Sequence, residues 1–261
     1  MYIYIHSHDT GPGDCPDTLL DSDGSYMSWA RATNSTGRWN WSKPEPLFPG
    51  YYGADTNFAP IILANGSVVA LWREWTELGS RQFVATATDW KNLSTYEQHI
   101  DRGEIFPDLG AAGTEDQFLY LDDDGFFHAV FHHMYGTGTS TQWWLDPTGG
   151  HAFSKDGWNW TYTGVAWGNA TARYDTPAGQ GGDVVFDDGT TKRFTRIERP
   201  HLILKSSSGE KEGTGLRGDP TYLINSAQYG MGTDPGGGAQ HDDACYTLVR
   251  PIGSSATSFW S

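Results

Sequence analysis

The chain has 261 residues, a length that suits one large β-domain or two small domains. Aromatic residues make up 14% of it, and the 33 Gly and 13 Pro argue against a helical bundle and for a β-rich core of bulky rings. The formal charge of −15 repels phosphate backbones, so we predict no nucleic-acid partner. No apolar run reaches about 18 residues, which excludes a membrane-spanning helix.

The first predicted strand, Tyr2–Ile5, follows Met1 directly, without the charged and apolar segments of a signal peptide. We therefore expect either that a signal has been removed or that the sequence begins inside a longer chain. Cys15 and Cys245 lie near opposite ends. In a secreted protein these two cysteines would form a disulfide that joins the first segment to the last, and the alternative is two buried thiols.

Further along the chain, short β-type runs alternate with turn clusters, and no segment keeps a helical period. Pairs of runs joined by a turn are predicted at residues 61–72, 118–131 and, with a longer insertion, 201–224. A strand of the Ala-x-Ser/Thr type that leads into a turn and an aromatic residue recurs at residues 29–39, 84–90 and 151–160. Each unit therefore holds two hairpin-linked strands and one or two more.

Repeated units of this kind predict an all-β fold, a five-bladed β-propeller formed as a single domain by residues 1–261. Three blades are expected to begin near Asn57, Asp116 and Glu198. The N-terminal segment would be the later part of a first blade that is incomplete at its N-terminus, and residues 245–249 a strand of a fifth blade. A β-sandwich also explains short strands, but it does not explain the recurrence of one two-part motif.

Carboxylates stand at two of these three blade starts. Because propeller strands begin at the central channel, Asn57, Asp116 and Glu198 are expected to converge there. Cleavage of a glycosidic bond needs a carboxylic acid to protonate the leaving oxygen and a carboxylate to activate water or attack. Glu198 is the candidate acid, and a buried ion pair with Arg196 or Arg199 is the alternative. For Asp116 the alternative is a cap at the strand entry.

Other polar and aromatic residues are candidates for binding a sugar: Asn57, Arg199, His201, His151 and Trp72. Trp72 could stack on a sugar face, although most of the 12 Trp must belong to the core. His132 and His133 could join His151 and His201 around a metal, but hydrogen-bonded core histidines are the better interpretation. We expect no required cofactor.

Six of the eight asparagines begin an Asn-x-Ser/Thr triplet: Asn34, Asn40, Asn65, Asn92, Asn159 and Asn169. Shared use of Asn and Ser in turns explains part of this excess. The density of triplets nevertheless favours an N-glycosylated protein of a eukaryotic secretory pathway, located outside the cell.

Three segments resemble one family. The run Ile197–Leu202 is similar to the general-acid strand of the five-bladed propeller glycoside hydrolases, the family 43-like group of arabinanases, xylosidases, invertases and levansucrases. Residues 115–125 resemble the strand with the aspartate that modulates the pKa of that acid. Residues 150–158 resemble the Ser-x-Asp-Gly outer hairpin of the group.

This resemblance implies that Glu198 is the general acid and Asp116 the modulator of its pKa. The catalytic base of the family is an Asp on the first strand of the first blade, a strand with no visible equivalent here. Asp9 and Asp55 are the nearest substitutes, and neither has the family's context. By the same resemblance, His241 would lie near a structural calcium ion in the central channel.

The function predicted from the sequence is a secreted glycoside hydrolase that acts on poly- or oligosaccharides. The alternative is a non-catalytic extracellular glycoprotein that binds glycans or has a structural role, with self-assembly or matrix proteins as partners. The amide of Asn57, the missing first strand and the dense triplets favour this alternative.

Overall fold

The computed structural model describes residues 2–7, 24–32, 39–43, 45–48, 57–76, 79–106, 113–133, 147–168, 183–194, 196–205, 216–228 and 245–252. Over these residues the regular structure consists of β-strands and two 3₁₀ turns, η1 (Leu93–Thr95) and η2 (Ile100–Arg102). The prediction of an all-β chain is confirmed. Among the described residues, no helix is long and apolar enough to cross a bilayer.

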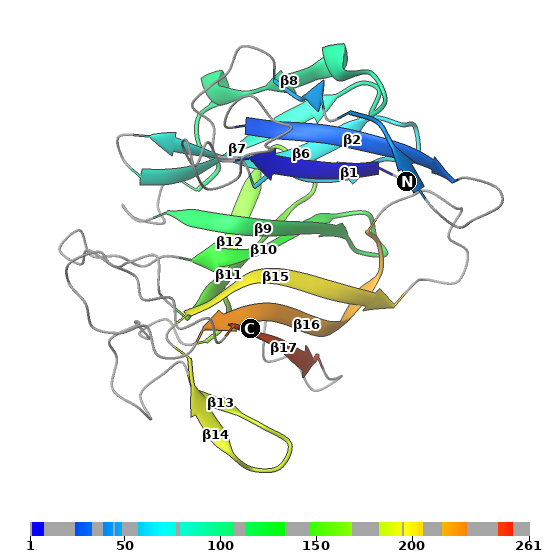
Figure 1. Cartoon of the computed structure of the whole chain (residues 1–261). Helices are drawn as coiled ribbons and strands as arrows, with labels where there is room; N and C mark the ends of the chain where they lie inside the picture. The colour runs from blue at the N-terminus through cyan, green and yellow to red at the C-terminus, as the bar shows by residue number, and fades with distance from the viewer. Residues whose placement is uncertain are drawn as a thin grey trace, which may run out of the picture.

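The strands form four larger antiparallel sheets, numbered I to IV in chain order (Figure 1). Sheet I contains β1 (Tyr2–Ser7), β2 (Gly24–Ala32), β3 (Trp39–Trp41) and β4 (Glu45–Pro46). Sheet II contains β5 (Ala59–Ile62), β6 (Val68–Thr76), β7 (Gly79–Ala87) and β8 (Tyr96–Gln98). Sheet III contains β9 (Thr114–Leu121), β10 (Phe127–His133), β11 (Gly149–Ser154) and β12 (Trp160–Trp167). Sheet IV contains β15 (Arg196–Lys205), β16 (Asp219–Gln228) and β17 (Cys245–Pro251), and β13 (Asp183–Val185) pairs with β14 (Thr191–Arg193) in a separate hairpin.

Turn chemistry explains why the predicted hairpins form where they do. Between β5 and β6 the Asn65 side chain accepts a hydrogen bond from the backbone N–H of Ser67 at 3.0 Å, and Gly66 takes a φ of +86°. Between β9 and β10 the Asp122 carboxylate accepts from the backbone N–H of Phe126 at 2.8 Å. Both turns therefore use an Asx side chain to fix the chain reversal.

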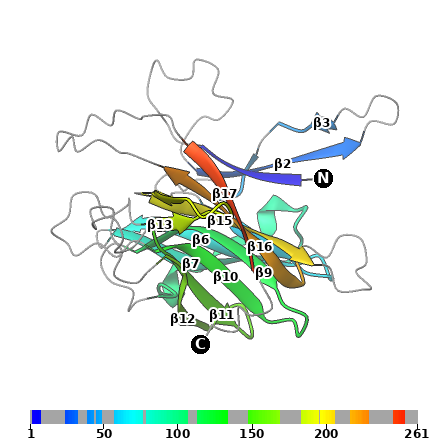
Figure 2. The same ribbon diagram turned by 90° about the horizontal axis from the view of Figure 1, so that it is seen from below.

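Sheets II, III and IV pack face to face in chain order, and the strand period of two sends alternate residues into different cores. On β6, Val68, Ala70 and Trp72 join the core beside residues 47–48, whereas Val69 and Leu71 join the core between sheets II and III. A third core lies between sheets III and IV. Figure 1 shows sheet III between its two neighbours, and Figure 2 shows the same sheets from below.

Two glycines allow close packing within sheet III. A Cβ on Gly149 would lie 2.2 Å from the ring of Trp167, and one on Gly150 would lie 2.5 Å from the ring of Phe131. Any larger side chain at either position would therefore displace a buried aromatic ring.

The predicted repeat units correspond to sheets II, III and IV, which begin with β5, β9 and β15. One prediction about these units was wrong. Residues 245–249 are not a strand of a fifth blade, because β17 pairs with β16 of sheet IV along its whole length, with Val249 opposite Ile224. The insertion of residues 229–244 separates β17 from its partner in the sequence and hides their hairpin relationship.

Candidate active site

Four titratable side chains from two neighbouring sheets meet at one point. Glu115 and Asp116 come from β9, His132 from the end of β10, and Glu198 from β15. Each offers a ligand-type atom within 4.8 Å of those of the other three. The starts of the first strands of sheets III and IV therefore converge, as the sequence predicted for Asp116 and Glu198.

A β-bulge lies directly after each of the two glutamates, Glu115 and Glu198. In β9 and in β15 the register shifts by one residue, between Glu115 and Phe118 and between Glu198 and His201. Asp116 (φ 55°) and Arg199 (φ 50°) are the non-glycine residues with positive φ in the described part of the chain. Bulges and strained residues of this kind re-aim side chains near functional sites.

The sequence suggested that Asp116 and Glu198 hold equivalent positions in their strands. The structure shows instead that Glu115 and Glu198 are equivalent, since each comes one residue before a bulge residue with positive φ.

Glu115 is held by cations and by a histidine. It forms ion pairs with Arg73 of β6 and, at 3.5 Å, with Arg196 of β15, and it lies 3.1 Å from Nδ1 of His132. Burial alone would raise the pKa of Glu115, but the hydrogen bond with His132 and the charges of Arg73, His132 and Arg196 outweigh it and lower this pKa to about 2. Glu115 is therefore a permanent anion at neutral pH.

The pKa of Glu198 is shifted in the opposite direction from that of Glu115. Its side chain is 6% exposed and forms an ion pair with Arg196, and Nε of Arg199 lies 3.5 Å from Oε1. Burial raises the pKa of Glu198, and the negative charges of Asp116 and Glu115 add to this, against the lowering effect of Arg196 and His132. A carboxyl group with a raised pKa keeps its proton to higher pH, which is what a general acid needs.

His132 links these two carboxyl groups electrostatically. Burial lowers the pKa of this fully buried imidazole, but its hydrogen bond with Glu115 and the charges of Glu115 and Glu198 raise it overall. The imidazolium form is therefore favoured more than in an ordinary histidine.

Asp116 lies between Asn57 and Arg199. The Asn57 amide donates a hydrogen bond to Oδ1 of Asp116 at 2.5 Å, and Nε of Arg199 is 3.9 Å from Oδ2. The backbone carbonyl of Asn57 in turn accepts from the side chain of Gln117. The structure thus brings together four residues that the sequence marked, Glu198, Asp116, Asn57 and Arg199.

Three other predicted sugar-binding residues lie elsewhere or in another environment. His201 is exposed, with its ring 5.3 Å from that of Phe118. His151 is buried against His128 and Thr163. Trp72 is 0% exposed and packs on Phe83, so the prediction that it stacks on a sugar was wrong. Its alternation with Leu71 along β6 places it in a core.

The four histidines considered as a metal set have separate partners: Glu115 for His132, Tyr162 for His133, His128 for His151 and Phe118 for His201. His132, His133 and His151 are hydrogen-bonded core histidines, whereas His201 is exposed. The oxygens of Glu115 already face Arg73, Arg196 and His132, so a calcium ion would have to displace charged partners there.

Several predictions fall outside the described residues: those on Cys15, Asp9, Asp55, His241, Asn34 and Asn169, and those on the side chains of Cys245 and Asn40. Of the remaining triplet asparagines, Asn65, Asn92 and Asn159 are all exposed.

Sequence reasoning missed the roles of Arg73, Glu115 and His132. Arg73 follows the apolar run of β6, and a charge in such a run was the available signal. Glu115 could have been found by aligning the strands on their strained residues, but those are visible only in the structure. His132 was considered as a metal ligand and not as a partner of a carboxylate.

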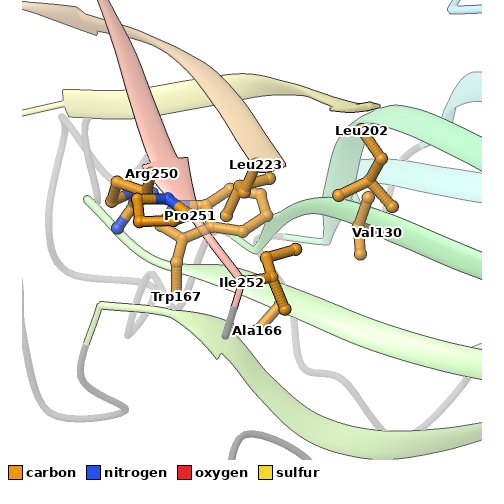
Figure 3. Close-up of a pocket in the computed structure, with 8 residues that line it drawn as sticks. All are labelled: Val130, Ala166, Trp167, Leu202, Leu223, Arg250, Pro251 and Ile252. Carbon is orange, nitrogen blue, oxygen red and sulfur yellow. The ribbon is translucent and has the colours of Figure 1, made fainter. Parts of the chain in front are cut away.

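Two cavities lie away from this cluster. One of about 50 Å³ between sheets III and IV is lined mainly by apolar side chains, among them Val130, Trp167 and Leu223 (Figure 3). It is too small for a sugar ring. A cleft of about 500 Å³ is lined by His99, Trp158 and Glu104 among others, and the carboxylate in it, Glu104, pairs with Arg81 at 2.6 Å. Among the residues that the structure describes, only the cluster around Glu198 combines several carboxyl groups with opposed pKa shifts, so we take it as the candidate active site.

No protein-family model matches the chain, and no curated protein matches its sequence. Among solved structures, the chain is similar to the GH32 beta-fructofuranosidase BmSUC1 of Bombyx mori (TM-score 0.51, 14% identity, 96% of this chain and 42% of that one). It is also similar to Zg3597, a family 117 glycoside hydrolase of the marine bacterium Zobellia galactanivorans (TM-score 0.48, 14% identity, 95% and 55%). A putative glycoside hydrolase of Parabacteroides distasonis gives a TM-score of 0.41 at 16% identity, over 68% of this chain and 48% of that one.

The chain therefore spans about half the length of these structures, between 42% and 55%. The structural neighbours are glycoside hydrolases, and the likeness to the beta-fructofuranosidase places the repeated sheets in a fold of the propeller type.

Proposed function

We propose that the protein is a glycoside hydrolase in which Glu198 protonates the leaving oxygen of a glycosidic bond. The observation that carries this proposal is the environment of Glu198, a buried carboxyl group with a raised pKa next to carboxylates that stay ionised or are hydrogen-bonded. Enzymes that cleave glycosides separate the roles of two carboxyl groups by giving them different environments.

In this proposal Asp116 tunes the acid and does not activate water. Its carboxylate lies within 4.8 Å of Glu198, whereas a pair that holds a water between its members needs roughly 6.5–9.5 Å. The negative charge of Asp116 raises the pKa of Glu198, which is the effect expected of a modulator. The base would then be another carboxylate, with Asp9 and Asp55 as candidates.

The wider setting is proposed with the same function. The sheets would be blades of a single five-bladed propeller domain in a protein secreted by a eukaryotic cell, with a Cys15–Cys245 disulfide and a structural calcium near His241. The exposure of Asn65, Asn92 and Asn159 suits N-glycans. Digestion of the native protein with an N-glycanase should lower its mass by several glycans, and an unchanged mass would remove the support for secretion.

A second candidate is a non-catalytic glycan-binding or structural glycoprotein on the same fold. One observation favours it, since Arg73 and Arg196 neutralise carboxylates of the cluster without any substrate. A complex between copies or with a matrix protein that buries about 1,000 Å² or more would support this candidate.

The test is a screen of plant- and algal-type oligosaccharides for released reducing ends, with wild type and Glu198→Gln. Loss of a general acid should lower kcat by about 10²- to 10⁴-fold. The matched control is Glu104→Gln, which neutralises a glutamate paired with Arg81 outside the cluster and should retain the wild-type rate.

An activated substrate separates an acid role from a structural one. A dinitrophenyl glycoside has a leaving group that needs no proton, so Glu198→Gln should cleave it at close to the wild-type rate. An unchanged rate of Glu198→Gln on natural glycans would show that Glu198 is not the acid.

A further inference from the structure

Arg199 is the cation of the cluster that reaches solvent. Its side chain is 65% exposed, against 9% for Arg73 and 21% for Arg196. The guanidiniums of Arg73 and Arg196, which are less exposed, contact carboxylates of the cluster through their terminal nitrogens. Arg199 therefore stands between the buried acid and the solvent from which a substrate arrives.

The terminal nitrogens of Arg199 are available. Its ion-pair contacts, 3.5 Å to Glu198 and 3.9 Å to Asp116, both involve Nε. Nη1 and Nη2 have no hydrogen-bond or ion-pair partner among the residues that the structure describes. A guanidinium whose two outer nitrogens are free presents parallel N–H donors that match the oxygens of a carboxylate or a sulfate.

The backbone holds this side chain in place at a conformational cost. Arg199 adopts φ 50° in the bulge of β15, a conformation that glycine would adopt without strain. The next residue is Pro200, whose ring restricts the chain further. A large cationic side chain at a position that favours glycine indicates that the side chain is used.

With Glu198 protonated, the charged groups of the cluster carry a net positive charge that an anion could neutralise. Three carboxyl groups, Glu115, Asp116 and Glu198, face three guanidiniums and the imidazole of His132. When Glu198 carries the proton that it must donate, the positive charges exceed the negative ones. This surplus is local, because the chain as a whole has a formal charge of −15.

We propose that the site takes an anionic sugar, with Nη1 and Nη2 of Arg199 binding the carboxylate of a uronic acid or a sulfate ester next to the bond that Glu198 protonates. This inference rests on the proposed function, since it names the substrate class of the same site. Asp116, which accepts a hydrogen bond from Asn57, lies 3.9 Å from Nε of this guanidinium and helps to position it.

The test uses matched pairs of oligosaccharides: uronic-acid oligosaccharides with their methyl esters, and sulfated galactan oligosaccharides with their desulfated counterparts. For each pair, kcat/KM is measured with wild type, Arg199→Gln, Arg199→Lys and Arg102→Gln. Arg102 is an exposed arginine over Trp158 in η2, so Arg102→Gln makes the same change in net charge away from the site. Binding to inactive Glu198→Gln is measured in parallel by calorimetry.

Wild type should prefer the anionic member of one pair. Arg199→Gln should reduce kcat/KM for that member by about 10- to 100-fold, and much less for its neutral counterpart. Arg199→Lys should restore part of the loss, and Arg102→Gln should change neither. Which pair shows the preference distinguishes a uronate from a sulfate ester.

Two results would overturn the inference while the proposed function stands: cleavage of neutral glycans without preference for an anion, or an equal effect of Arg199→Gln on both members. If no glycan is cleaved but an anionic one binds in an Arg199-dependent way, the proposed function fails and the anion site stands. If no glycan is cleaved or bound, both are wrong.

Discussion

The two ends of the β9–β10 pair each join a carboxylate to a histidine, and the two pairs differ in what surrounds them. At the start of β9, Glu115 lies 3.1 Å from His132, and at its far end Asp122 lies 3.0 Å from His128. Both pairs join a carboxylate to an imidazole at an end of the same two strands, so the main difference in chemistry comes from the neighbours.

At the first end the neighbours belong to other sheets. Arg73 comes from sheet II, and Arg196 and Glu198 come from sheet IV. At the far end the partners belong to sheet III itself, because His128 lies 3.0 Å from His151, which lies 2.5 Å from Thr163. The first end therefore collects charges across sheet interfaces, and the far end is a hydrogen-bonded chain that fixes one sheet and its hairpin.

The pKa values of the histidines at the two ends are shifted in opposite directions. Glu115 and Glu198 raise the pKa of His132, against its burial. Burial, with the nearby His128, lowers the pKa of His151 to about 3. The pKa of a buried imidazole is thus raised where carboxylates lie against it and lowered where burial and another imidazole prevail.

Replacing the carboxylate should show the largest contrast. Glu115→Ala removes the carboxylate that pairs with Arg73, Arg196 and His132, and the free energy of unfolding should fall by about 3–5 kcal/mol. Asp122→Ala removes hydrogen bonds at a partly exposed hairpin and should lower it by about 1 kcal/mol. Urea denaturation of both variants measures the contrast. Equal losses of unfolding free energy in the two variants would show that the cations around Glu115 do not make its contribution to stability larger than that of Asp122.

The titration of His151, at the far end of the β9–β10 pair, should make the folded protein less stable in acid. His151 titrates near pH 6.5 in the unfolded chain and near pH 3 in the folded one, so the unfolded state binds more protons between these values. The free energy of unfolding should therefore fall as the pH drops from 6.5 to 3, by about 4 kcal/mol from this group.

The measurement is the free energy of unfolding of wild type and of His151→Gln between pH 6.5 and pH 3. The variant lacks the titrating imidazole, so its stability should fall less in acid. His132 should act in the opposite direction, since its raised pKa gives stability that is lost as the pH rises through that pKa. If His151→Gln keeps the same loss in acid as wild type, the imidazole is not the source.

A smaller effect is expected in the pH profile of activity. Asp116→Asn removes a charge that raises the pKa of Glu198, so the alkaline limb of kcat/KM should move to lower pH by about 0.5–1 pH unit. Asp122→Asn at the far end is the matched change and should leave the limb in place. A limb that stays fixed in Asp116→Asn would contradict the modulating role.

The smallest effect concerns Thr163, the exposed end of the histidine chain. Thr163→Val removes the hydroxyl that lies 2.5 Å from Nδ1 of His151 and should lower the free energy of unfolding by about 0.5 kcal/mol. Activity should not change. A loss of activity would mean that the far end communicates with the first end, which the comparison does not predict.

The sequence by itself determined the features that depend on neighbours along the chain. The Asx–Gly turns predicted the β5–β6 and β9–β10 hairpins, because Asn65 and Asp122 bond to residues only two and four positions away. The recurring motif predicted where sheets II, III and IV begin, and strand starts that converge predicted the meeting of Asn57, Asp116, Arg199 and Glu198.

Only the tertiary structure decided the rest, because the deciding contacts join residues far apart in the sequence. Arg73 and Arg196 lie 42 and 81 residues from Glu115, and no local pattern connects them. Trp72 is in a core because its face of β6 meets residues 47–48, and β17 belongs to sheet IV because it pairs with β16 across an insertion. The charge state of Glu198 depends on burial and on charges from two sheets, and both are consequences of how the sheets pack.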